Sequence, residues 1–432
     1  MQSPIVIYWF RRDLRLEDNH ALHRALRCGL PVLPIFIFDS NILEELNDSS
    51  DARITFIYDA LQPIQNELRG YESSVKIYHG NPSDVWKTIV EEYSVKAVFF
   101  NRDYEPYAVT RDTSIEKFLR EKEIDVWHYK DQVIFEHSEI SKDNGSPYTV
   151  YTPYSKKWRI ALNENDYQPY STKEYCGNFV KKLYLFPSLE SIGFTRTSVA
   201  LPPLHVPIDS IRRYHTTRDI PAIDDTTRLG IHLRFGTVSV RSLLATALPL
   251  NDVFVKELQW REFFMQILWH FPHVVSQSFR REYDAIVWRN NEEEFSAWTQ
   301  GKTGYPLVDA GMRQLNATGF MHNRVRMVTA SFLCKHLLID WRKGEQYFAQ
   351  KLLDYELSAN NGNWQWAAGT GCDAAPYFRV FNPTMQQEKF DPDLQYCQQW
   401  IPELGTSEYP LPIVEHAFAR DRALTAYKAA LQ

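Results

Sequence analysis

Short apolar runs alternate with longer amphipathic stretches over the first third of the chain. The runs are rich in β-branched and aromatic residues and end in polar turns, as in PIVIYWF, PVLPIFIFD, VKIYHG and KAVFFNRDY. Helical periodicity lies between them, near residues 18–28, 53–69, 82–93 and 108–122. This alternation predicts a doubly wound, parallel, Rossmann-like α/β sheet, which binds ligands beyond the carboxyl ends of its strands. No GxGxxG follows the first run, so the dinucleotide fingerprint is missing.

The pattern changes beyond the first third. Turn residues, proline and serine are frequent in residues 131–205, as in SKDNGSPYTVYTPYSKKW. Strand signals then almost vanish, and apolar residues recur at three- and four-residue steps, for example from Met327 to Trp341. The pattern therefore predicts an α/β domain over residues 1–130, an interdomain linker over 131–205 and an all-α domain over 206–432.

Composition narrows the class of protein. With 432 residues, of which 44% are hydrophobic, the chain can fill two sizeable cores. Its net charge of -6 gives no global basic signature, so any contact with nucleic acid has to come from a local patch. The five cysteines are widely spaced and form no CxxC motif, which predicts reduced thiols in an intracellular protein without a metal cluster. No apolar run is long enough to cross a membrane.

The motif TTRLG, from Thr226 to Gly230, precedes a helical pattern. Hydroxyls, an arginine and free backbone N–H groups at a helix start suit a phosphate or pyrophosphate. The alternative is an ordinary helix start with a threonine as its N-cap, which is the commoner case. Taken alone, the motif favours the cap.

The stretch KELQWREFF places Glu257, Trp260, Arg261 and Phe264 on neighbouring faces of one helix. A carboxylate, a guanidinium and an indole on adjoining faces can line a cavity for a flat polar ring. The alternative is an amphipathic helix with a Glu–Arg surface pair, and this stretch by itself favours that simpler interpretation.

Two later stretches concentrate polar side chains. GFMHNRVRM sets Arg324 and Arg326 at the start of an apolar helix, where positive charge opposes the helix dipole and indicates an anionic partner. The motif DYE, from Asp354 to Glu356, supplies carboxylates that Arg326 can meet. NNGNWQWAAGTGCDAAPYFR combines three asparagines with two tryptophans, and an amide can donate to or accept from a ring nitrogen whose protonation changes.

Taken together, these motifs resemble the photolyase/cryptochrome family. The resemblance covers nearly the whole chain. It begins at WFRRDLRLEDNHAL, continues through TTRLG and WREFF, and is strongest from AWTQGKTGYPLVDAGMRQLNATGFMHNRVRM to NNGNWQWAAGTGCDAAPYFRVFNP. The chain is most similar to class I cyclobutane pyrimidine dimer (CPD) DNA photolyases. The resemblance implies an α/β antenna domain and a helical catalytic domain that binds FAD, active as FADH⁻.

The resemblance also implies roles for individual residues, carried over by position. The expected cofactor-binding residues are Tyr214, Thr226, Thr227, Arg228, Leu229, Gly230, Phe254, Glu257, Arg261, Asn323, Arg326, Asp354, Glu356 and Asn360. Asn360 is expected beside flavin N5, where it stabilises the reduced state. Glu356 stands where the family usually has Asp, and Gly230 where it usually has Ser, so each position can lose or lengthen one hydrogen bond.

A repair pocket for a flipped pyrimidine dimer is implied as well. Its expected catalytic residues are Glu257, Trp260, Asn323, Met327, Asn360 and Trp366. The expected electron-transfer chain that photoreduces the flavin is formed by Trp364, Trp341 and Trp288. The residues expected near the phosphates of the damaged strand are Arg218, Arg261, Arg324 and Arg379. The implied mechanism is that excited FADH⁻ passes one electron to the dimer, the cyclobutane ring splits, and the electron returns.

The antenna chromophore is left open by the resemblance. Ala108 stands where the folate-binding subgroup has Glu, which argues against methenyltetrahydrofolate. A deazaflavin, a flavin or no second chromophore are the alternatives. The expected partner is UV-damaged DNA containing pyrimidine dimers. We expect a cytoplasmic, DNA-associated monomer without a membrane or an obligate protein partner.

Three alternatives compete with a CPD photolyase. The first is a cryptochrome-type blue-light photoreceptor without repair activity. Against it, Trp260, Met327 and Asn360 are kept at positions where plant receptors often differ, and no long tail follows the helical region. The second is a (6-4) photolyase, which has catalytic histidines where this chain has Asn323 and Met327. The third is a passive DNA-damage binding module, which a bound, redox-active FAD would argue against.

Overall fold

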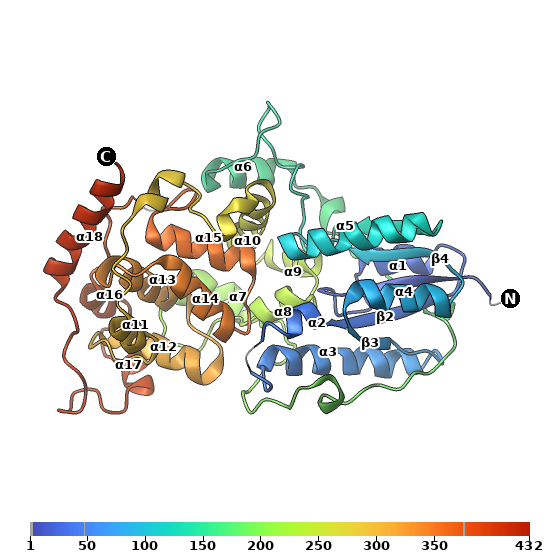
Figure 1. Cartoon of the computed structure of the whole chain (residues 1–432), viewed down its shortest axis with the longest axis horizontal. Coiled ribbons are helices and arrows are strands. Elements are labelled where there is room, and N and C mark those ends of the chain that lie inside the picture. Colours follow the sequence, from blue (N-terminus) through green and yellow to red (C-terminus); the bar gives the residue numbers. More distant parts are fainter. Residues whose placement is uncertain (1–2, 47, 375) are drawn as a thin grey trace. The chain divides into compact units, whose positions relative to one another are not determined.

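The computed structural model describes residues 3–46, 48–374 and 376–432. The chain forms two compact units, and neither is one continuous stretch (Figure 1). The α/β unit consists of Met1–Glu139, Ala161–Val206 and Leu229–Pro249, and the helical unit of Ile140–Ile160, Pro207–Arg228 and Leu250–Gln432. The region expected as a linker is therefore shared between the two units. Every helix in the described part of the chain is too short or too polar to span a bilayer.

In the described residues of the α/β unit, five parallel strands form one sheet in the order β3-β2-β1-β4-β5. They are β1 (Ile5–Phe10), β2 (Val32–Asp39), β3 (Lys76–Gly80), β4 (Val95–Asn101) and β5 (Asp125–Tyr129). The two strands at the centre of the apolar pattern, β1 and β2, are buried along their whole length, as expected when helices cover both faces of a sheet. The predicted parallel α/β sheet is confirmed.

The fifth strand was not predicted by the apolar pattern. β5 lies at an edge of the sheet and has the sequence DVWHY, in which Val126 is buried while Trp127 is 50% exposed. An edge strand that is covered on one side alternates between apolar and exposed positions. It therefore lacks the continuous apolar run that marked β1, β2 and β4.

Several helices of the α/β unit start where the sequence offers an N-cap. The helices of this unit are α1 (His20–Leu26), α2 (Ser40–Leu43), α3 (Ala52–Arg69), α4 (Pro82–Glu92), α5 (Pro106–Glu121), α8 (Gly230–Phe235) and α9 (Val240–Ala247), with short helical turns η1 (Glu164–Tyr167), η2 (Lys173–Asn178) and η3 (Glu190–Ile192). The side chains of Asn19, Asp51 and Asn81 each accept a backbone N–H from the first turn of α1, α3 and α4.

A buried ionic network joins α9 to the sheet, although α9 follows much later in the chain. The Arg241 guanidinium donates to Asp18 at 2.9 Å and to Asp131 at 2.7 Å, and Arg15 donates to the other oxygen of Asp131 at 2.6 Å. Breaking such a pair would leave a buried charge without a partner. These bonds explain why residues 229–249 pack with the α/β unit and not with the helices that flank them in the sequence.

The helical unit contains the remaining described elements and no strand among them. They are α6 (Tyr151–Ala161), α7 (Ile208–Thr217), α10 (Asp252–His270), η4 (Pro272–Val275), η5 (Arg281–Ala285), α11 (Glu292–Thr299), α12 (Pro306–Thr318), α13 (Asn323–Ser331), η6 (Phe332–His336), α14 (Trp341–Lys351), α15 (Leu357–Ala368), α16 (Pro383–Phe390), α17 (Gln395–Trp400) and α18 (His416–Ala430). The predicted all-α second half is confirmed, and it includes α6 from the expected linker.

The helix α15 is held on two sides by glycine contacts. A Cβ atom on Gly362 would lie 2.1 Å from the ring of Phe264 on α10, and one on Gly344 of α14 would lie 2.2 Å from the ring of Trp364. Real side chains do not approach so closely, so both positions require glycine for helix packing. The stretch around Asn360 is therefore fixed between α10 and α14.

Candidate functional site

A pocket with an empty volume of about 590 Å³ opens in the helical unit between α13, α14 and α15. Its lining residues are Asn323, Arg326, Met327, Ala330, Phe348, Leu352, Asp354, Tyr355, Glu356, Ala359, Asn360, Asn363, Trp364, Trp366 and Ala367. The structure thus brings together eight residues that the sequence assigned separately to cofactor binding, catalysis and electron transfer.

Two arginines are fixed against carboxylates of the pocket. Arg326 donates to both oxygens of Asp354 at 2.9 and 3.1 Å, as the motif DYE suggested. Arg261 of α10 forms a fork with Glu356, at 2.9 and 3.1 Å. The Glu–Arg surface pair considered for KELQWREFF is not formed, because Glu257 and Arg261 each bond to a different helix or loop. Paired in this way, the guanidinium groups are held in place for further polar contacts.

Asn360 is oriented by a residue that the sequence did not single out. Its side-chain Nδ2 donates to the carboxylate of Glu345 at 2.8 Å and to the backbone oxygen of the same residue at 3.1 Å. Burial raises the pKa of Glu345. Because the donor of the amide is already used, the atom left for a ligand is the acceptor Oδ1. Glu345 lies four residues after Trp341 on α14. This helical spacing was the one feature of the sequence that could have placed Glu345 near the site.

The three expected electron-transfer tryptophans lie in or against one hydrophobic core. Trp364 and Trp341 are 2% and 1% exposed, whereas Trp288 is only partly buried. Trp341 is three residues before Gly344, which contacts the Trp364 ring, so both lie on the same face of α14. The indole N–H groups of Trp341 and Trp364 are buried and have no hydrogen-bond acceptor among the described residues.

Glu257 is held in a second cluster, at the side of α10 that faces α7. Arg218 donates to its carboxylate at 2.5 Å and lies 5.3 Å from the centre of the Tyr214 ring. Burial raises the pKa of Glu257, and the nearby Arg218 opposes this effect. Tyr214 also packs its ring on Phe254 at 5.3 Å. The expected cofactor residues Tyr214 and Phe254 therefore share this cluster with Glu257.

Arg324 links this cluster to the pocket. It donates to Asp219 at 2.7 Å, lies 4.3 Å over the ring of Phe390 and contacts the sulfur of Met327 at 3.6 Å. Arg379 is exposed, and its backbone N–H donates to Pro376. Arg324 is therefore partly neutralised by a neighbouring carboxylate, whereas Arg379 extends into solvent.

The TTRLG motif does not form the threonine cap considered for it. Helix α8 has Leu229 as its N-cap and no side-chain capping bond, so the threonine cap is wrong. Arg228 bonds to Asp224 at 2.8 Å and lies 4.7 Å over the Phe320 ring, whose other neighbour is Arg326. Thr226, Thr227 and Arg228 belong to the helical unit, and Leu229 and Gly230 to the α/β unit.

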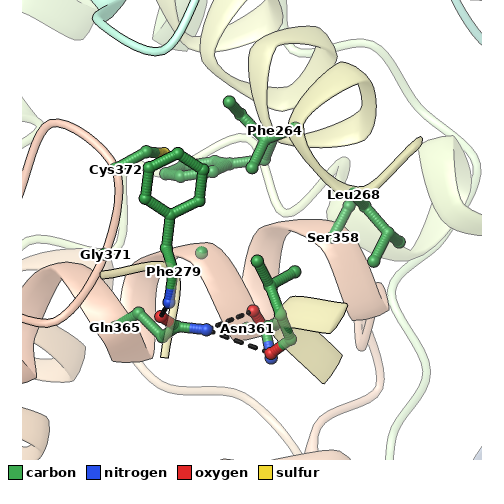
Figure 2. A pocket seen from close by; sticks show the side chains of 11 residues that line it. Phe264, Leu268, Phe279, Ser358, Asn361, Gln365, Gly371 and Cys372 are labelled. Carbon is green, nitrogen blue, oxygen red and sulfur yellow. Dashed lines mark hydrogen bonds between the residues drawn. The ribbon is translucent and has the colours of Figure 1, made fainter. Parts of the chain in front are cut away.

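A second, smaller cavity of about 280 Å³ lies on the other face of α15 (Figure 2). Two of its polar side chains bond to the same backbone group: Asn361 and Gln365 both donate to the Val274 carbonyl, at 2.9 and 3.0 Å. Burial raises the pKa of Cys372 to about 12, so this thiol is not a nucleophile. Successive asparagines thus serve different faces: Asn361 holds the helix in place, while Asn360 and Asn363 line the larger pocket.

Comparison with known proteins explains this set of residues. Residues 6–172 match the family described as DNA photolyase, and residues 254–408 match the FAD binding domain of DNA photolyase. The chain is 37% identical to the deoxyribodipyrimidine photo-lyase of Agrobacterium fabrum, over 99% of this chain and 98% of that protein. This chain belongs to the DNA photolyase family.

Solved structures of the family have the same fold. A bacterial class III photolyase from Agrobacterium tumefaciens matches with a TM-score of 0.87 and 34% identity, over 100% of this chain and 98% of that one. An archaeal photolyase from Sulfolobus tokodaii, solved with two FAD molecules, matches with a TM-score of 0.82 and 34% identity, over 98% of this chain and 99% of that one. The resemblance to photolyases and the two-part fold are confirmed.

The residues of the pocket fit FAD, judged by their own chemistry. The pocket combines fixed guanidinium groups with an amide whose free atom is an acceptor, and the buried Trp364 N–H lacks a protein partner among the described residues. Acceptor atoms of a bound cofactor match the guanidinium and indole N–H donors, and a protonated ring nitrogen matches the amide acceptor. The family match over residues 254–408 covers the whole pocket.

Proposed function

We propose that this protein is a deoxyribodipyrimidine photo-lyase, a carbon–carbon lyase that uses blue light to split cyclobutane pyrimidine dimers in DNA. The observation that carries the proposal is the single pocket in which Asn360, Met327 and Trp366 meet the tryptophan Trp364. This pocket is lined by residues expected for the cofactor, for the lesion and for electron supply, and the expected lesion residues Glu257 and Trp260 lie outside its lining. We further propose that the enzyme acts on DNA inside the cell as a monomer.

FAD is the cofactor, held by the pocket residues of the helical unit. When bound and reduced, it absorbs light, supplies one electron to the dimer and takes it back after the ring has opened. Arg326 and Asp354, with Arg261 and Glu356, form its polar frame. Asn360 Oδ1 would be the atom available to accept from a bound reduced ring, because the bond to Glu345 keeps the amide donor turned away. This arrangement favours the state in which the ring nitrogen is protonated.

Glu345 gives a testable consequence of this arrangement. In Glu345→Ala the amide of Asn360 loses the carboxylate acceptor and keeps only its bond to the backbone oxygen of residue 345, so its Oδ1 is less firmly oriented toward the cofactor. We expect faster reoxidation in air of the reduced protein, with FAD still bound. Stopped-flow absorption in the dark measures the rate, and Glu345→Gln, which keeps an acceptor oxygen, serves as the matched control. An unchanged rate in Glu345→Ala would remove Glu345 from the cofactor site.

The lesion is held by aromatic surfaces and one carboxyl group. Trp260 and Trp366 offer faces for the flipped bases, and base–aromatic stacking is worth about 1–3 kcal/mol per base. Glu257 is placed to hydrogen-bond to a base edge; burial raises the pKa of its carboxyl group, and the nearby Arg218 opposes this effect. Arg218 keeps this side chain in one position before DNA arrives. Excluding water from the site prolongs the life of charged species.

Replacing Glu257 tests this role. In Glu257→Ala, binding of an oligonucleotide with one thymine dimer is expected to weaken about tenfold, because one hydrogen bond to a desolvated base is lost. Glu257→Gln keeps a donor and an acceptor and should lose less. Fluorescence anisotropy in darkness measures both affinities, and undamaged DNA of the same sequence is the reference. Equal affinity in Glu257→Ala and wild type would place this carboxyl outside the lesion site.

The direction in which electrons reach the cofactor depends on how deeply each of the three tryptophans is buried. Trp364 and Trp341 have no acceptor for their indole protons among the described residues, so a positive charge left on either ring cannot be fixed by proton loss. Trp288 is partly exposed and can release its proton to water. The chain Trp364, Trp341, Trp288 therefore moves positive charge from the pocket toward solvent.

DNA contacts come from a local basic rim on an acidic protein. Arg218, Arg324 and the exposed Arg379 contact phosphates of the damaged strand, so binding weakens with salt. The function is tested by dark binding followed by light: a dimer-containing oligonucleotide should bind tightly in darkness and dissociate after blue light, because repaired DNA binds poorly. A complex that persists after illumination contradicts the proposal.

A further inference from the structure

One aromatic contact at the lesion site comes from outside the helices that line it. Tyr151, the first residue of α6, stacks on Trp260 with ring centres 3.6 Å apart and planes 7° from parallel. Phe264 packs near the same indole at 5.5 Å and 29°. Trp260 is nevertheless only partly buried, so some of its surface remains open to a ligand.

The ring of Tyr151 is itself held in place on α10. Its hydroxyl donates to the Lys256 carbonyl at 3.0 Å and lies 3.4 Å from the side-chain oxygen of Gln259. Burial raises the pKa of Tyr151 to about 12, so the phenol stays protonated and keeps this bond at physiological pH. Its ring edge also packs on Phe263 at 5.8 Å. Tyr151 therefore has one position against the indole.

The backbone of Tyr151 reaches a different part of the site. Its N–H donates to the Asp373 carboxylate at 3.1 Å. Asp373 lies in the loop that follows α15, the helix that carries Trp366. One residue thus contacts both the helix of Trp260 and the loop after the helix of Trp366, although it belongs to a segment that the sequence pattern assigned to a linker.

We propose that Tyr151 is a positioning residue of the lesion site, holding the indole of Trp260 in the orientation against which a flipped pyrimidine dimer stacks. The inference rests on the proposed function. A side chain that is already ordered loses less conformational freedom on binding, so its partner binds more tightly. Discrimination of damaged from undamaged DNA therefore depends on a side chain that stacks on one face of the tryptophan.

Three single variants test the proposal. Tyr151→Leu should weaken dark binding of the thymine-dimer oligonucleotide about fivefold, and leave the affinity for undamaged DNA and the bound-flavin spectrum unchanged. Tyr151→Phe keeps the ring and should retain most of the discrimination. Ser155→Ala removes a 2.8 Å bond between the same helix and Gln259 without touching Trp260, and should behave as wild type. Loss of discrimination in Tyr151→Phe equal to that in Tyr151→Leu would overturn the proposal.

A double variant separates positioning from general packing. If Tyr151 acts through the indole, Tyr151→Leu adds nothing to the loss already caused by Trp260→Ala. A further loss in that background, or an unchanged discrimination in Tyr151→Leu alone, would overturn the proposal while leaving the repair function intact. A wild-type protein that does not distinguish damaged from undamaged DNA would instead overturn the proposed function, and the inference with it.

Discussion

Replacing Trp364 with phenylalanine is expected to slow photoreduction of the oxidised protein by an order of magnitude or more and to leave repair by the chemically reduced protein intact. Trp364 lies in the wall of the pocket and contacts the α14 helix of Trp341. Phenylalanine fills most of the same space but is far harder to oxidise than an indole. The first step of electron supply therefore fails, whereas lesion binding has no need of it.

The two activities are measured separately. Photoreduction is followed by absorption under blue light with an external reductant, and repair is followed after reduction with dithionite in darkness. Trp298→Phe is the matched control, because Trp298 packs on Trp364 at 6.1 Å but is not one of the expected electron carriers. Loss of repair by pre-reduced Trp364→Phe would show that this residue shapes the lesion site instead.

Gly344→Ala is expected to have the largest effect on stability. The new Cβ would lie 2.2 Å from the ring of Trp364 and 2.5 Å from Leu333, so the ring or the helix has to move. Overpacking of this kind costs about 1–3 kcal/mol of folding free energy. Because Trp364 lines the pocket, the same displacement should weaken FAD retention. Thermal unfolding and the flavin content of the purified protein measure the two effects.

Gly177→Ala supplies the control for this change. A Cβ at Gly177 would meet nothing within 4 Å, so the same substitution is made without a clash. We expect wild-type stability and flavin content there. A Gly344→Ala protein that unfolds at the wild-type temperature with its full complement of FAD would mean that α14 and α15 are packed more loosely than described.

Strands that are covered on both faces of the sheet could be predicted from the sequence, and the edge strand β5, which is covered on one face, could not. Strands β1, β2 and β4 are apolar runs because the sheet interior excludes water from both faces, and such runs are visible in a sequence. The edge strand β3 is only partly buried, and its shorter run VKIYHG was still recognised. β5 escaped because Trp127 and its alternate neighbours face solvent at the sheet edge. Likewise, α9 belongs to the α/β unit because Arg241 donates to Asp18 and Asp131. These partners are far from Arg241 in the sequence, so no local sequence pattern predicts the contacts.

In the candidate site, too, contacts indicated by a local motif could be predicted, and contacts between residues far apart in the chain could not. The pairing of Arg326 with Asp354 could be predicted from the sequence. Arg326 lies at a helix start, where positive charge indicates an anionic partner, and the DYE motif supplies carboxylates. Glu345 and Tyr151 could not be predicted, since each acts through one contact with a residue far away in the chain. The asparagine-rich stretch looked uniform in sequence, yet helical geometry turns Asn360 and Asn361 to different cavities.

Direct reversal of the lesion tests the central claim most simply. The protein, pre-reduced, is mixed with an oligonucleotide that carries one cyclobutane thymine dimer, and half of the mixture is kept in darkness. We predict that blue light restores the 260 nm absorbance of intact thymines and that the dark sample keeps its dimers. Persistence of the dimers in the illuminated sample, with FAD bound and reduced, would contradict the account and favour a light receptor without repair activity.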